Sequence, residues 1–177
     1  EYSSITILNL FNAAVYFSRL TNKLFNTFYF TGLGKDHLSE MMIKRFKYEN
    51  LKIDLIQRIE GKYPGLYSIQ TDKKGNRSFS YWRNESAAKE MIKKCNLDNL
   101  EKFIGNTELF YYTGISLGIL KPKDQNKLVE LSKKSKLTAF DFNYRNSFHG
   151  NKIKSQSLFK KSNLNSKINF ISFDDII

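Results

Sequence analysis

Apolar and polar positions alternate most regularly between residues 63 and 85. This alternation predicts two β-strands, Gly65–Asp72 and Asn76–Arg83, joined by the turn Lys73-Lys74-Gly75. A hairpin loop of this length commonly ends on a residue in the left-handed backbone region, which favours the glycine found there. The stretch therefore predicts an antiparallel hairpin.

The register of this hairpin follows from its turn. If Asp72 pairs with Asn76, counting outwards along both strands places Tyr67 opposite Tyr81. The side chains on one face of this hairpin either pack on a core or bind a ligand. An arginine at its end favours a ligand with a carboxylate or phosphate, because the guanidinium offers a planar fork of donors. The side chains expected on one face are Tyr67, Ile69, Phe79, Tyr81 and Arg83.

Strand-like and helix-like patterns alternate along most of the remaining chain. Short apolar or β-branched runs predict strands at residues 25–31, 55–59, 108–113, 137–142 and 168–173. Apolar residues at helical spacing predict helices at 13–20, 37–48, 87–94, 97–103 and 121–134. Asn12 is predicted to cap the first helix, and residues 147–167 show only weak helical signals. The alternation predicts an α/β fold with a mainly parallel central sheet flanked by helices, and the hairpin stands off it as a flap.

In such a sheet, ligands bind beyond the carboxyl ends of the strands. Residues 114–116, 143–145 and 174–175 are all predicted to lie at such ends. In an extended segment, Asp141, Asn143 and Arg145 would project to one side and suit a phosphate or a hydroxylated ligand. A purely structural polar network at the strand end is the alternative.

Composition narrows the class of protein. The 177 residues indicate one domain, and the net charge of +12 comes from lysines scattered through every segment, so no nucleic-acid partner is expected. A single cysteine, Cys95, excludes an internal disulfide and favours the reducing cytoplasm. No apolar run reaches membrane-spanning length, so no membrane partner is expected. The chain opens on Glu1 without a signal pattern, and we interpret it as a fragment.

Motifs for other chemistries are incomplete. Gly32-x-Gly34 lacks the third glycine of a dinucleotide fingerprint and is typical of a turn. His37 and His149 have no second histidine or cysteine at ligand spacing, so no metal site is predicted. Ser116 lies outside any G-x-S-x-G elbow, which argues against a hydrolase.

Several longer motifs together resemble the ribokinase-like (PfkB) sugar kinases, over roughly residues 12–145. The hairpin run PGLYSIQTDKKGNRSFSYWRNESAA, with IQRIEGK before it and YYTGISLGIL and FDFNYR after it, is similar to the branch that acts on 2-keto-3-deoxygluconate. TGLGKDHLSEMM resembles the family's G-x-G-x-D segment, and NAAVYFSRL resembles the helix that precedes it. The resemblance implies a ribokinase-like sheet with a small β lid over the sugar, which here lies within residues 63–85.

The resemblance also implies a reaction, the ATP-dependent phosphorylation of 2-keto-3-deoxygluconate to its 6-phosphate. ATP and Mg²⁺ are the implied cofactors, a small sugar acid is the implied partner, and a homo-oligomer is compatible with the family. By matching motif, Tyr67, Tyr81 and Arg83 are expected to contact the sugar acid from the lid. Ile115 is expected to line the pocket, Arg145 to reach the substrate from the sheet, and Asn143 to lie near the transferred phosphate.

The chain departs from the family pattern in two places. The family's catalytic aspartate, in a Gly-Ala-Gly-Asp motif, is expected downstream of Ile177, and the first strand is expected before Glu1. Ile7-Leu8-Asn9 stand where the family has Gly-Gly-Asp. The leading hypothesis is therefore the N-terminal, sugar-binding portion of such a kinase, with no catalytic residue in this chain and no activity alone. The alternative is a degenerate, non-catalytic remnant.

Overall fold

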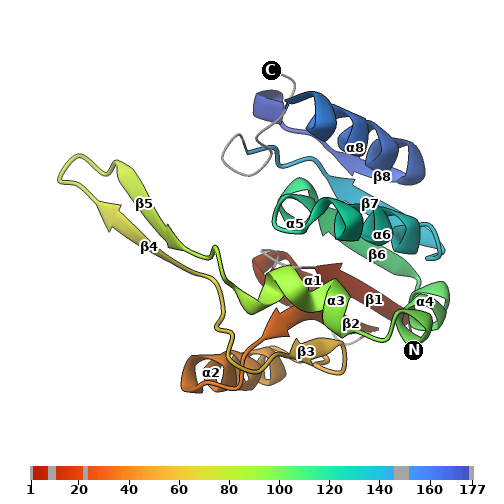
Figure 1. The fold of residues 1–177 in the computed structure, drawn as a ribbon, viewed down its shortest axis with the longest axis horizontal. Coiled ribbons are helices and arrows are strands. Elements are labelled where there is room, and N and C mark those ends of the chain that lie inside the picture. The colour runs from red at the N-terminus through yellow and green to blue at the C-terminus, as the bar shows by residue number, and fades with distance from the viewer. Residues whose placement is uncertain (1, 8–10, 22–23, 146–151, 176–177) are drawn as a thin grey trace.

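A parallel β-sheet forms the centre of the molecule (Figure 1). The computed structural model describes residues 2–7, 11–21, 24–145 and 152–175. Within them, one sheet has the order β3-β2-β1-β6-β7-β8, and every adjacent pair is parallel. Its strands are β1 (Tyr2–Ile7), β2 (Phe25–Leu33), β3 (Ile56–Arg58), β6 (Leu109–Thr113), β7 (Leu137–Asp141) and β8 (Ile168–Phe170). The predicted α/β architecture is confirmed.

The central strand β1 is the main departure from the predicted elements. It pairs with β2 on one side and with β6 on the other, although no strand was predicted before Asn12. The centre of this sheet is therefore formed by residues that were not predicted to be a strand. Serines at positions 3 and 4 interrupt the apolar pattern, but the isoleucines and the threonine that follow them favour a strand. Ile7 ends this strand, whereas Leu8 and Asn9 lie outside the described residues.

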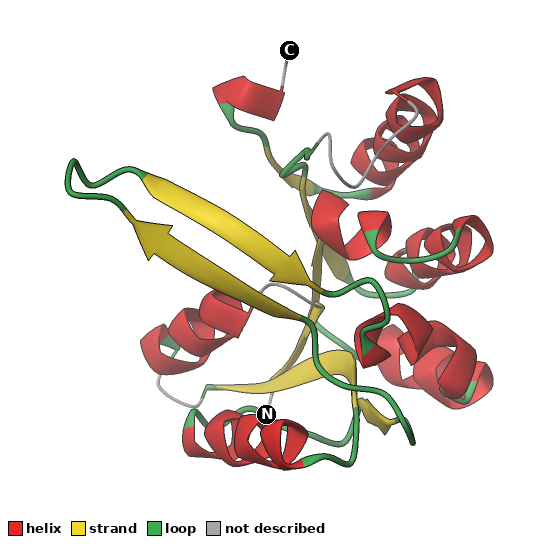
Figure 2. Cartoon of the chain, turned by 60° about the vertical axis from the view of Figure 1, so that its left-hand side comes forward, coloured by secondary structure: helices red, strands yellow, loops and turns green. Residues whose placement is uncertain are grey.

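Helices cover both faces of the sheet (Figure 2). The first begins at Phe11, so Asn12 lies within it and the prediction that Asn12 caps it is wrong. The segment with weak helical signals contains a helix that was not predicted, α8. The helices are α1 (Phe11–Leu20), α2 (His37–Tyr48), α3 (Met91–Lys94), α4 (Leu97–Gly105), α5 (Gly114–Gly118), α6 (Pro122–Ser132) and α8 (Lys152–Asn165), with short 3₁₀ helices at Ala87–Glu90 and Phe173–Asp175.

Strand β2 shows how one sheet supports two cores. Tyr29 and Leu33 pack with the buried residues of α1 and α2, among them Phe46. Phe30 packs with the larger core, which includes Phe110 and residues of α3 to α6. Neighbouring side chains along a strand point to opposite faces, so a continuous apolar run supplies both cores at once. None of the helices within the described residues is long and apolar enough to cross a membrane.

The predicted hairpin forms a separate two-stranded sheet, here called the lid, that projects from the body (Figures 1 and 2). Its strands are β4 (Leu66–Thr71) and β5 (Arg77–Trp82). Tyr67 pairs with Tyr81, and the Asp72 amide donates to the Asn76 carbonyl at 3.0 Å. Gly75 has a φ of 85°, as the turn requires. The predicted register is confirmed.

Candidate functional site

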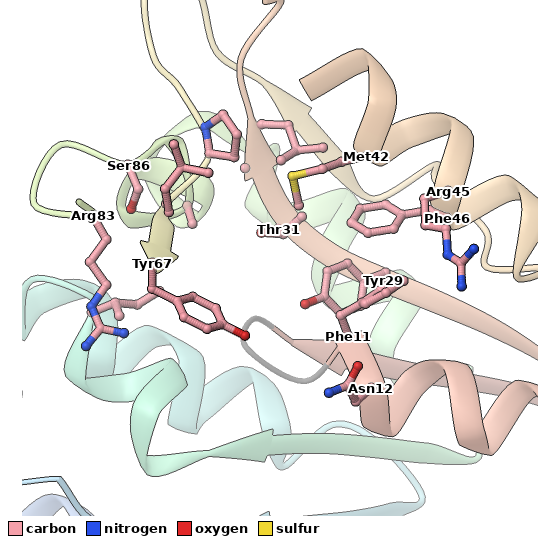
Figure 3. A pocket seen from close by; sticks show the side chains of 17 residues that line it. Phe11, Asn12, Tyr29, Thr31, Met42, Arg45, Phe46, Tyr67, Arg83 and Ser86 are labelled. Atoms are coloured by element: carbon pink, nitrogen blue, oxygen red, sulfur yellow. The ribbon is translucent and has the colours of Figure 1, made fainter. Parts of the chain in front are cut away.

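A cavity of about 380 Å³ lies where the base of the lid meets the body of the molecule (Figure 3). Its walls come from α1, the carboxyl end of β2, α2 and the two connections to the lid. The lining residues are Phe11, Asn12, Tyr29, Thr31, Gly32, Leu33, Met42, Arg45, Phe46, Pro64, Gly65, Leu66, Tyr67, Arg83, Ser86, Ala88 and Ile119.

Polar groups from three separate elements face one another across this cavity. Figure 3 shows the hydroxyls of Tyr67 and Tyr29 and the amide of Asn12 directed toward the same space. Tyr67 belongs to the lid, Tyr29 to β2 and Asn12 to α1. Tyr29 is only 4% exposed, so its hydroxyl is the polar end of a side chain that is otherwise in the core. The groups together can bind a ligand that carries several hydroxyls.

Arg83 reaches the same cavity from the end of the lid's second strand. Its guanidinium carbon lies 3.9 Å from the centre of the Tyr81 ring, and the Tyr81 ring lies 6.2 Å from that of Tyr67. Burial lowers the pKa of Arg83, but a guanidinium stays charged at any physiological pH. The stacked arrangement limits the orientations of the fork and holds a positive charge at the cavity edge. Tyr81 is thus not one of the residues described as lining the cavity, but its ring supports the Arg83 guanidinium.

The two connections of the lid are fastened to each other. The Ala87 amide donates to the Tyr63 carbonyl at 2.9 Å, and the Lys62 ammonium lies 2.8 Å from a Glu85 carboxylate oxygen. Gly34, at the end of β2, packs directly on the Lys62 carbonyl, since a Cβ added there would lie 1.8 Å from that oxygen. These contacts fix the lid base relative to the strand that carries Tyr29 and so define the cavity.

A buried carboxylate joins the two helices that form one wall of the cavity. Glu49 follows α2 and is 3% exposed. It accepts from Arg19 of α1 through Nε at 2.8 Å and Nη2 at 2.7 Å, and Arg45 Nη2 lies 2.6 Å from its Oε1. Figure 3 shows the Arg45 guanidinium turned away from Thr31. Arg45 at the cavity wall therefore shares the Glu49 carboxylate with Arg19.

Replacing Glu49 by glutamine should remove a pH-dependent part of the stability. Hydrogen bonds from Arg19 hold the pKa of Glu49 below its usual value of about 4.5. A carboxylate with a lowered pKa stabilises the fold above the unfolded-state pKa, and this stabilisation disappears as the pH falls through the folded-state pKa. We expect Glu49→Gln to unfold at lower urea than the unchanged chain at pH 7, and the difference to narrow as the pH falls below 4.5.

Urea titrations at several pH values measure this effect. Glu60→Gln is the matched control, because its ion pair with Lys35 is largely exposed and should contribute little. A difference for Glu49→Gln that stayed constant from pH 7 to pH 3 would contradict the role given to its charge.

The structure brings two of the predicted site residues to the cavity. Tyr67 and Arg83 line it, whereas Tyr81, Ile115, Asn143 and Arg145 are not among its described lining residues. Ile119, which directly follows α5, lines the cavity instead. Ile115, Asn143 and Arg145 do lie at the carboxyl ends of β6 and β7, as predicted.

Those strand ends form a polar network of their own. The Tyr111 hydroxyl donates to Asp141 Oδ2 at 3.2 Å, and burial raises the pKa of Asp141. The Tyr144 amide donates to Asp175 Oδ1 at 2.6 Å. Asn143 has a φ of 38°, so the segment after Asp141 is not extended. The prediction that its polar side chains project to one side of an extended segment is therefore wrong.

Sequence reasoning missed the body side of the cavity. Tyr29, Thr31 and Met42 were not singled out, although the alternation along β2 places Tyr29 and Thr31 on one face. Asn12 was predicted as a helix cap, a role that the helix bounds exclude. No cluster of His, Cys, Asp or Glu that could hold a metal ion is found within the described residues.

Comparison with known sequences identifies relatives for nearly the whole chain. The model of the pfkB family carbohydrate kinases matches residues 11–166. The 2-dehydro-3-deoxygluconokinase of Escherichia coli K12 is 35% identical over 169 residues, which cover 93% of this chain and 55% of that protein. The enzyme of the same name from Dickeya dadantii is 33% identical, with 93% and 54% covered. The chain thus spans about half the length of the curated relatives it matches.

Solved structures support the same fold. The 2-dehydro-3-deoxygluconokinase of Thermotoga maritima superposes with a TM-score of 0.80 at 17% identity, over 99% of this chain and 61% of that one. An uncharacterized sugar kinase from Pyrococcus horikoshii in complex with ATP gives a TM-score of 0.73 at 20% identity, over 96% and 62%. The family match covers the lid, the cavity and most of the sheet, and the chain belongs to the pfkB family of carbohydrate kinases.

Proposed function

We propose that this chain provides the sugar-acid site of an ATP-dependent kinase that phosphorylates 2-keto-3-deoxygluconate. One observation carries the proposal: Tyr67 and Arg83, which belong to the lid motif shared with these kinases, line a cavity at the lid base. The named relatives at 33–35% identity are kinases for this sugar acid.

The chemistry of the cavity suits this ligand. A sugar acid has a carboxylate at one end, which the Arg83 fork can bind through two parallel hydrogen bonds. Its hydroxyls can bond to the phenols of Tyr67 and Tyr29 and to the amide of Asn12, which share one space. The volume of about 380 Å³ lies within the range of small-molecule sites.

Phosphoryl transfer requires groups beyond this cavity. ATP, when bound, supplies the phosphoryl group that is transferred to the terminal hydroxyl of the sugar acid. Asn143 and Arg145 remain candidates for contacts near the transferred phosphate and the substrate, because they follow a strand whose carboxyl end faces the ligand side of such folds. We assign no described residue to Mg²⁺. We propose the cytoplasm, where ATP is available, as the location of this reaction.

Calorimetric titration of the chain with 2-keto-3-deoxygluconate tests the proposed function. We expect one site with a dissociation constant between about 1 μM and 1 mM, the usual range for enzyme substrates. Lys74→Ala is the matched control, since it removes a positive charge at the exposed tip of the lid and should bind equally well. A folded chain that released no heat at millimolar sugar acid would refute the proposal.

A further inference from the structure

The cavity has two chemically different sides. Arg83 and Tyr67 give the lid side its charge and a phenol hydroxyl, and Asn12 and Tyr29 add polar groups from the body side. The side formed by α2 and its neighbours is largely apolar. Figure 3 shows the Met42 thioether reaching from α2 toward Thr31, inside this wall. The apolar residues of the wall are Phe11, Leu33, Met42 and Phe46.

Met42 is held in place by the start of its helix. Asp36 caps α2 by accepting from the Ser39 amide at 3.1 Å and from the Ser39 hydroxyl at 2.6 Å. The Ser39 hydroxyl in turn accepts from the Gly34 amide at 2.9 Å. The next residue, Ile43, and Phe46 are buried in the core beneath the helix. The helix therefore presents Met42 to the cavity from a fixed backbone.

A thioether discriminates between a methylene and a hydroxyl-bearing carbon. It is apolar and polarisable, and its sulfur is only a weak hydrogen-bond acceptor. A ligand hydroxyl pressed against the sulfur would leave water without gaining a comparable partner from it, whereas a methylene would lose nothing. A cavity with this wall therefore favours a sugar acid that lacks a hydroxyl on the carbon facing α2.

We propose that Met42 is a specificity-determining residue that selects the deoxy carbon of the sugar acid. The selection acts through the apolar wall, while Arg83 binds the carboxylate and Tyr67 a hydroxyl. This inference deepens the proposed function and depends on it, because it assumes a sugar acid in this cavity. An apolar pocket discriminates against an added hydroxyl by at most about 100-fold, so the preference should lie between about 10- and 100-fold.

Two ligands and two variants test the inference. 2-Keto-3-deoxygluconate and 2-ketogluconate differ only by the hydroxyl on carbon 3, and calorimetry gives the ratio of their dissociation constants. The unchanged chain should prefer the deoxy compound by about 10- to 100-fold. Met42→Leu keeps the volume and the apolar character and should keep the ratio. Met42→Gln keeps the length but offers an amide, and it should reduce the ratio by about 10-fold.

The outcomes separate this inference from the function on which it depends. If Met42→Gln left the ratio of the two dissociation constants unchanged, the role of Met42 would be overturned and the proposed function would stand. An equal fall in the ratio of dissociation constants for Met42→Leu and Met42→Gln would overturn it too, because the shape of the side chain rather than its polarity would then be responsible. Failure of the folded, unchanged chain to bind either compound would refute both proposals.

Discussion

The Arg83→Ala variant should bind 2-keto-3-deoxygluconate about 100-fold more weakly than the unchanged chain. The ligand carboxylate loses its hydrogen bonds to water on binding, so tight binding requires a charged donor in the site to replace them. Hydrogen bonds of this kind contribute about 1.5–3 kcal/mol each. Arg83 lines the cavity and is held by the Tyr81 ring, so its fork is oriented before the ligand arrives.

Calorimetric titration of purified variants measures this loss. Arg83→Lys keeps the charge but not the planar fork, and we expect it to recover only part of the affinity. Lys74→Ala removes a charge at the exposed lid tip and serves as the control for general electrostatic attraction. Equal affinity of Arg83→Ala and Lys74→Ala for the sugar acid would exclude Arg83 as the carboxylate ligand.

A single methyl group at Gly34 should destabilise the fold and disturb the lid base. The Cβ of Gly34→Ala would lie 1.8 Å from the Lys62 carbonyl oxygen, so backbone must move. Overpacking of this kind costs about 3 kcal/mol. Because Lys62 precedes the first strand of the lid, the displacement should also weaken sugar-acid binding. Urea unfolding gives the first effect and calorimetry the second.

Gly105→Ala provides the matched control for this substitution. Gly105 ends α4, and apart from its chain neighbours and the backbone of its own helix no atom lies within 4 Å of the position that its Cβ would take. An alanine there should leave binding unchanged and leave the stability equal or raise it by up to about 1 kcal/mol. An equal loss of stability in the two variants would show that the close contact with Lys62 is not the reason why position 34 requires glycine.

The lid could be predicted in detail because its information is local. Strand alternation and one glycine at the turn determine which residues pair, and the structure has Tyr67 opposite Tyr81 as expected. The regular strands and helices from β2 to α6 follow in the same way from apolar spacing. Their parallel arrangement follows from the alternation of strand and helix.

The cavity and the central strand could not be predicted in this way. The cavity brings together Asn12, Tyr29 and Met42, which are distant in sequence, and no local pattern shows that their side chains meet. Strand β1 was missed because two serines interrupt its apolar run, and pairing with strands on both sides stabilises it. The conformation of the segment after Asp141 was mispredicted because a left-handed residue such as Asn143 has no periodic signature.

The most direct measurement compares two ligands on the unchanged chain. 2-Keto-3-deoxygluconate and 3-deoxyglucosone, which has an aldehyde in place of the carboxylate, share the remaining groups of the sugar. If the lid and cavity form a sugar-acid site with Arg83 as the carboxylate ligand, calorimetry should show the acid binding about 100-fold more tightly. Equal affinities for the acid and the aldehyde, or binding of neither by the folded chain, would contradict that site.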